Sequence, residues 1–241
     1  MQEFGRVLTN VSGAVPASVV ALLALVLVGY RGTWRVLRNV VTIAHEAGHA
    51  LVALLSGRRL NGIRLHSDTS GLTVSTGPAR GPGMVLTLFA GYPAVSLLGA
   101  VAAWTVSAEH VEVMLWTAVG ALALLLIALR NLYGVLSVVL TGLALAAVIR
   151  WGTPPVTVVC AELLSWLLLL GGVRPLFELS GKRRRGRASD SDADQLARLT
   201  GVAGGVWMAV WFVISVGLLV LGARWLLDLP PLAEFSAPVS G

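Results

Sequence analysis

A series of long apolar stretches constrains this chain more than any other feature. Seven of them approach or exceed the roughly 20 residues that a helix needs to span a bilayer. They cover approximately residues 14–30, 39–56, 83–107, 111–129, 132–149, 155–173 and 202–226. Hydrophobic residues make up 56% of the 241 positions and charged residues only 12%, which is too much apolar surface for the core of one small globule. We therefore expect an all-α polytopic membrane protein with about six to seven transmembrane helices, forming a single integral membrane domain over residues 1–241.

The net charge of +6 comes mostly from short basic segments between these stretches. Basic segments beside apolar helices mark the cytoplasmic side and meet anionic lipid, so we expect a lipid bilayer and no nucleic acid as partner. The strongest basic segment, 181–187, then lies in the cytoplasm and the acidic loop 108–112 lies outside. Segments 31–38 and 58–64 are both basic with an apolar stretch between them. Either one of the two is external, or the helix at 39–56 does not cross completely.

Two polar segments interrupt the apolar pattern. Residues 57–82 are rich in Gly, Ser and Thr, with β-like runs at Gly62–His66 and Leu72–Ser75 around the turn "SDTSG", which predicts a β-hairpin. Residues 180–200 predict a cytoplasmic basic linker followed by a short helix that starts near Ser191, because acidic residues fill its first turn. Residues 1–13 contain no small-residue cleavage site, so we expect no removable signal peptide.

The run "HEAGH", residues 45–49, carries the strongest chemical signal. On a helix, His45 and His49 at i and i+4 project from one face and can grip a single ion, with Glu46 beside them to take a proton from water. The alternative is a helix with structural polar residues, but ionisable groups inside a membrane cost roughly 2.5–3.5 kcal/mol each on insertion scales and are usually functional.

An H-E-x-x-H motif within a membrane helix, followed by a hairpin and further helices, resembles the site-2 protease family of intramembrane zinc metallopeptidases. The resemblance implies metal ligands His45 and His49 and general base Glu46. It also implies a membrane-associated hairpin at 57–82 that presents an extended substrate strand, with contacts from Gly71, Leu72 and Thr73 in "SGLTVS". The segment "AGYPAVS", 90–96, is similar to the family's Gly-Pro-containing helix beside the site. An ordinary proline kink explains that segment equally well.

The chain departs from the family at the third ligand. Typical members carry an aspartate in an Asn-x-x-Pro…Asp-Gly motif, whereas this chain has "RNLYGVLSVVLTG", with Asn131 but no proline and no Asp-Gly. The short "Ser-Asp-Ala" at 191–193 resembles the equivalent element of a bacterial B-like branch, which implies Asp192 as the third zinc ligand. Helix capping by Ser191 and charge compensation by the acids is the alternative. Asn131 is a candidate for binding the substrate backbone, or an interfacial residue beside Arg130.

Together these observations predict a multi-pass protein of the bacterial cytoplasmic membrane that acts as a zinc metalloendopeptidase. We expect one Zn²⁺ per chain and, as substrates, membrane proteins cut in or near their transmembrane segments. The alternative from another class is a non-catalytic membrane protein, either a transporter of ions or small molecules or a pseudoprotease, with a structural metal site.

Overall fold

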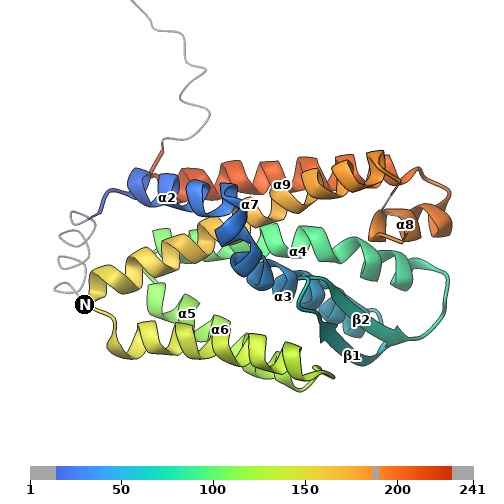
Figure 1. Cartoon of the computed structure of the whole chain (residues 1–241), viewed down its shortest axis with the longest axis horizontal. Helices are drawn as coiled ribbons and strands as arrows, with labels where there is room; N and C mark the ends of the chain where they lie inside the picture. Colours follow the sequence, from blue (N-terminus) through green and yellow to red (C-terminus); the bar gives the residue numbers. More distant parts are fainter. Residues whose placement is uncertain (1–14, 187–189, 230–241) are drawn as a thin grey trace, which may run out of the picture.

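The computed structural model describes residues 15–186 and 190–229, so the signal-peptide prediction lies outside the described residues. The fold is mostly helical with one two-stranded hairpin, which confirms the predicted fold class (Figure 1). In chain order the elements are α2 (Ala17–Gly29), α3 (Arg31–Leu55), β1 (Arg59–Leu65), β2 (Gly71–Thr76), α4 (Pro82–Ser107), α5 (Val111–Leu126), α6 (Leu132–Trp151), α7 (Pro154–Arg184), α8 (Asp192–Thr200) and α9 (Gly204–Leu226). The division of the chain into domains stays a prediction.

Within residues 15–186 and 190–229, four helices, α4, α6, α7 and α9, are long and apolar enough to cross a membrane. The pair α2 and α3 gives a fifth span if it is counted as one, although the two helices are bent by 97° to each other. This number is lower than the six to seven expected, because two of the apolar stretches form the bent pair and the stretch 111–129 yields a helix of only 16 residues. The basic residues at 31–38 lie inside α3 rather than in a loop between two spans. They therefore need not be assigned to the cytoplasmic or the external side as a separate loop.

Helix α4 is the centre of the bundle, since it packs against α3, α7 and α9 (Figure 1). The short helix α8 lies at one end of α4 and α9. A buried apolar cluster joins these elements: Leu88, Leu176, Leu179, Ala193, Leu196 and Trp211. Ala193 and Leu196 are fully buried, so the apolar face of α8 fixes this helix against the bundle.

Strand β1 lies between β2 and the loop that joins α5 to α6. It pairs with β2 in antiparallel register, from Arg59 opposite Thr76 to Leu65 opposite Gly71. On its other edge, Ile63 exchanges backbone hydrogen bonds with Ala128 (2.8 Å) and Arg130 (2.9 Å). In the described part of the chain, no strand pairs with the outer edge of β2.

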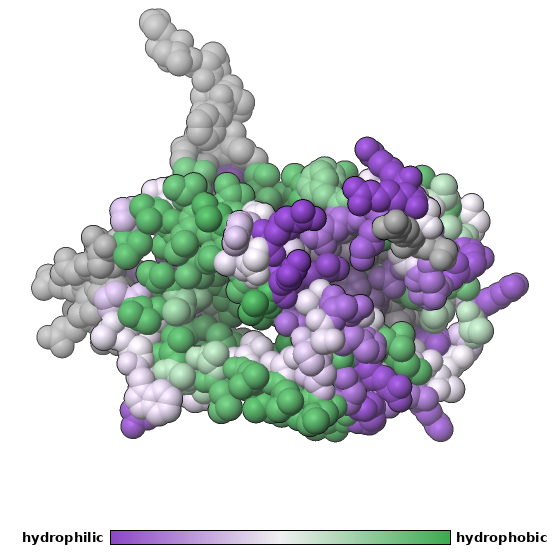
Figure 2. Space-filling view, in the orientation of Figure 1, coloured by the Kyte–Doolittle hydropathy of each residue, from purple (hydrophilic) through white to green (hydrophobic). Residues whose placement is uncertain are grey.

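On the face shown in Figure 2, hydrophilic residues gather toward the side that carries α8, the hairpin and the end of α7, and hydrophobic residues predominate toward the opposite side. The long apolar helices α4, α6, α7 and α9 support a multi-pass membrane protein.

Candidate metal centre

Helix α3 brings two imidazole rings together. His45 and His49 are one helical turn apart, so both project from the same face. Their Nε2 atoms lie 3.0 Å apart and the rings meet edge to face with centroids 4.6 Å apart. His49 is only 6% exposed.

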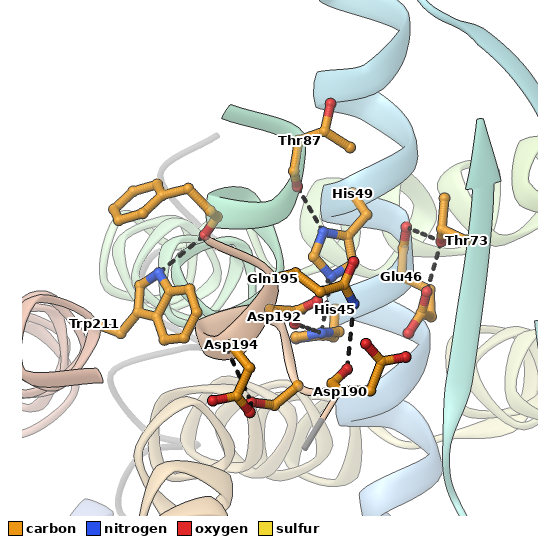
Figure 3. Close-up of polar contacts among 12 residues, drawn as sticks. His45, Glu46, His49, Thr73, Thr87, Asp190, Asp192, Asp194, Gln195 and Trp211 are labelled. Atoms are coloured by element: carbon orange, nitrogen blue, oxygen red, sulfur yellow. Dashed lines mark hydrogen bonds and ion pairs between the residues drawn. The ribbon is translucent and has the colours of Figure 1, made fainter. Parts of the chain in front are cut away.

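A backbone carbonyl fixes the orientation of His49. The Nδ1 atom of His49 lies 2.6 Å from the carbonyl oxygen of Thr87 in α4, a contact drawn as a dashed line in Figure 3. A carbonyl oxygen only accepts hydrogen bonds, so Nδ1 carries the proton and Nε2 faces His45. Metal-binding histidines are commonly held through their second nitrogen in this way.

The carboxylate of Asp192 reaches the two rings from α8 (Figure 3). Its Oδ2 lies 3.3 Å from Nε2 of His45 and 3.5 Å from Nε2 of His49. Burial alone would raise the pKa of the Asp192 carboxyl, but hydrogen bonds and charge attraction from the two rings, when each ring carries both its protons, outweigh burial and hold this pKa well below its usual range. Asp192 is therefore ionised and available as a ligand.

The acidic residues at the start of α8 could serve either as helix caps or as a metal ligand, and the structure assigns these roles to different residues. Ser191 is the N-cap, and its hydroxyl oxygen accepts a hydrogen bond from the backbone N–H of Asp194. The Asp194 side chain accepts from Ser191 Oγ at 2.6 Å and forms an ion pair with Arg183 at the end of α7. Capping thus falls to Ser191 and Asp194, while the Asp192 side chain turns to the histidines.

The absence of a side chain at Gly91 gives the imidazoles their room. A Cβ atom built on Gly91 of α4 would lie 2.5 Å from both Cε1 of His45 and Nε2 of His49. Such distances are essentially never seen for real Cβ contacts. The glycine of the "AGYPAVS" segment is therefore required by the site and not only by a kink.

The proline of the same segment has a different consequence. Pro93 lies inside α4 and has no N–H for the carbonyl of Phe89 one turn earlier. The indole Nε1 of Trp211, from α9, donates to that carbonyl at 3.1 Å (Figure 3). Trp211 also stacks on Tyr92, whose ring meets the edge of His45 at 4.8 Å between centroids.

Glu46 turns away from the three converging side chains toward strand β2 (Figure 3). Its Oε2 accepts a hydrogen bond from Thr73 Oγ1 at 2.6 Å, and the side chain is only 4% exposed. Gly71 makes this approach possible, because a Cβ there would lie 2.5 Å from Cγ of Glu46. Thr73 therefore binds the Glu46 carboxylate and Gly71 leaves room for it, whereas the predicted contacts of Gly71, Leu72 and Thr73 with a substrate stay predictions.

A cleft of about 820 Å³ opens over this group. Strand β2 lines it on one side, including Gly71, Leu72 and Thr73, and the start of α8 with Asp192 lines it on another. Leu72 is half exposed, so it is free to meet a ligand.

Asn131 is not among the residues that line this cleft. Its side-chain amide accepts from the backbone N–H of Leu65 at 3.1 Å and donates to the Leu65 carbonyl at 2.6 Å. The amide thus extends the outer edge of β1 as another strand would. A role of Asn131 toward a substrate stays a prediction.

Sequence reasoning missed Thr87, Arg183 and Trp211. Thr87 and Trp211 contact helices that are distant in the sequence, Arg183 contacts the next helix, and no motif marks any of these three contacts. The one available signal concerned Trp211. Pro93 has no N–H, so the carbonyl of Phe89 needs a hydrogen-bond donor from another part of the chain.

The donor set fits a divalent transition metal. Two imidazole nitrogens and one carboxylate oxygen, from His45, His49 and Asp192, all lie within 4.8 Å of one another. Three protein ligands of these types, with a fourth position left for water, are the pattern of catalytic zinc sites. No thiolate belongs to this ligand group, because Cys160 lies in α7 and is not part of it.

The family model described as Peptidase M50B-like matches residues 17–222, which include every side chain of the group above. No curated protein and no solved structure matches the chain.

Proposed function

Because the chain belongs to the Peptidase M50B-like family, within the site-2 protease family, we propose that it is an intramembrane zinc endopeptidase. It hydrolyses peptide bonds in or near transmembrane segments of other membrane proteins. The observation that carries this proposal is the meeting of His45, His49 and Asp192 with Glu46 at their side, at the base of one cleft.

His45, His49 and Asp192 would hold one zinc ion. When bound, zinc supplies a Lewis acid for the peptide carbonyl and makes water more acidic. The protein contributes the rigid arrangement: the Thr87 carbonyl orients His49, and Gly91 leaves space for both rings. Arg183 holds α8, which carries Asp192.

Glu46 acts as the general base. It follows His45 directly and sits in the same cleft, so it is within reach of a water that approaches the three ligands. Thr73 holds its carboxylate beside β2 through a hydrogen bond, and Gly71 leaves the space for it. The proton taken from water by Glu46 then passes to the leaving amine.

Strand β2 offers the place where an unwound substrate binds. A peptide carbonyl within a helix is hydrogen-bonded, so the substrate segment must be extended before water can attack it. The outer edge of β2 is unpaired within the described residues, and an extended peptide can add to such an edge through backbone hydrogen bonds. Leu72 and Val74, 50% and 41% exposed, alternate with the inward-facing Thr73 and can contact substrate side chains.

The test uses membrane vesicles that contain the full-length protein and a set of single-span reporter proteins with different transmembrane sequences. Fragments are identified by mass spectrometry for the wild type and for Glu46→Gln, which keeps the shape and the metal ligands. We expect cleavage within the membrane segment by the wild type only, with zinc content equal in both. Equal cleavage by both forms would refute the role of Glu46, and intact reporters with zinc bound in both forms would favour the non-catalytic alternative.

A further inference from the structure

A groove separate from the metal centre runs between the end of α7 and the start of α9. Its volume is about 470 Å³. Both helices are candidate membrane spans. The groove therefore opens at the side of the bundle where lipid molecules would pack.

The groove is basic at one end and aromatic at the other. Arg183 and Arg184, in the last turn of α7, line the basic end. Phe177, two turns earlier, meets Phe212 of α9 edge to face with ring centroids 5.4 Å apart. Arg184 follows Phe177 by seven positions in the helix, so the two ends lie about 10 Å apart along the axis. A phospholipid has the same order of parts, with a charged headgroup above apolar chains.

The aromatic end of the groove is accessible from outside the protein. Phe177 is 62% exposed and Phe212 is 37% exposed, although both are large apolar side chains. Gly205 lines the basic end, and a Cβ built on it meets no atom within 4 Å. Space for a headgroup is therefore present beside the arginines.

The charges at this end select an anion. Arg184 is exposed and has no acidic partner among residues 15–186 and 190–229. Lys182 and Arg185, its neighbours in the basic segment, do not line the groove. Arg183 already pairs with Asp194 and retains further N–H groups in its guanidinium. Basic pockets between membrane helices bind anionic headgroups.

We propose that this groove binds one anionic phospholipid, with its phosphate at Arg184 and Arg183 and an acyl chain along Phe177 and Phe212. The site lies outside the catalytic cleft and does not depend on peptidase activity. Arg183 lines the groove and also supports the metal centre indirectly, because its pair with Asp194 holds α8. The test therefore changes Arg184 and leaves Arg183 intact.

The experiment titrates delipidated full-length protein in detergent with phosphatidylglycerol or with phosphatidylcholine of the same acyl chains. Native mass spectrometry counts the bound lipids. We expect one phosphatidylglycerol per chain at concentrations where phosphatidylcholine does not bind. Arg184→Gln should weaken this binding by about fivefold, the effect of one basic contact near a membrane surface. Gly205→Leu, which fills the basic end without removing charge, should weaken it as well.

Arg185→Gln is the matched control, because it removes the same charge one residue outside the groove lining. We expect phosphatidylglycerol binding by this variant to equal that of the wild type. Equal losses in Arg184→Gln and Arg185→Gln would mean unspecific attraction to a basic segment and would overturn the proposal. Displacement of the lipid by inorganic phosphate at equal concentration would overturn it too, since the site would then recognise free phosphate without the acyl chain.

Discussion

Gly91→Ala should weaken metal binding, although it replaces none of the three proposed ligands. The new Cβ would lie 2.5 Å from Cε1 of His45 and from Nε2 of His49, whereas carbon contacts are comfortable at about 3.5–4.0 Å. One or both rings must therefore move by about 1 Å. Metal sites tolerate ligand displacements of only about 0.2 Å, and disturbing the support of a ligand costs roughly 10–100-fold in metal affinity. We expect Gly91→Ala to lose zinc at a chelator concentration at least tenfold lower than the wild type does.

The assay measures zinc per chain after dialysis against a series of chelator concentrations. Gly217→Ala is the control, because Gly217 also lies inside a long helix, α9, and a Cβ there meets nothing within 4 Å. Thermal unfolding of both variants shows whether the bundle remains intact. Zinc retention by Gly91→Ala equal to that of Gly217→Ala would refute the packing of α4 against the two rings.

Three other predictions concern the contacts around the centre. Trp211→Phe leaves the Phe89 carbonyl without its donor and should lower the free energy of unfolding by about 1–3 kcal/mol. Trp207→Phe should have less effect, because its indole contact is longer at 3.4 Å; equal unfolding midpoints of the two variants would contradict this. Arg183→Gln should lower zinc retention because Asp194 loses its ion pair, with recovery in Arg183→Lys; a loss that Lys does not restore would show that charge is not the cause. Thr73→Val should leave zinc content unchanged and slow reporter cleavage by about tenfold or more, since Glu46 loses a hydrogen bond to a charged group; unchanged cleavage would remove Thr73 from the positioning of Glu46.

Local patterns in the sequence were sufficient where the structure is local. The i, i+4 spacing of His45 and His49 predicts a shared helix face, and α3 presents both rings to one point. The alternation around "SDTSG" predicts the hairpin, although β1 begins three residues before the expected Gly62, at Arg59. The cap at Ser191 likewise follows from acidic residues in the next turn.

Features that depend on tertiary contacts could not be predicted in the same way. Hydropathy identifies apolar stretches but not the 97° bend between α2 and α3, so it overestimates the number of spans. Asn131 bonds to Leu65, which is 66 positions away, and no local signal distinguishes this from a free amide. The approach of Asp192 to α3 depends on the burial of Ala193 and Leu196 against α4, α7 and α9. The sequence could name Asp192 only through a family resemblance.

The central claim is that His45, His49 and Asp192 together hold one metal ion, and zinc analysis of three purified proteins tests it most directly. The wild type should contain about one zinc per chain. Asp192→Ala should lose the metal, because the carboxylate next to both imidazoles is gone. Asp190→Ala removes a carboxylate two residues away that pairs only with the exposed Arg198 in the ion pairs described, and it should keep the metal. Zinc content in Asp192→Ala equal to that in Asp190→Ala would contradict the account.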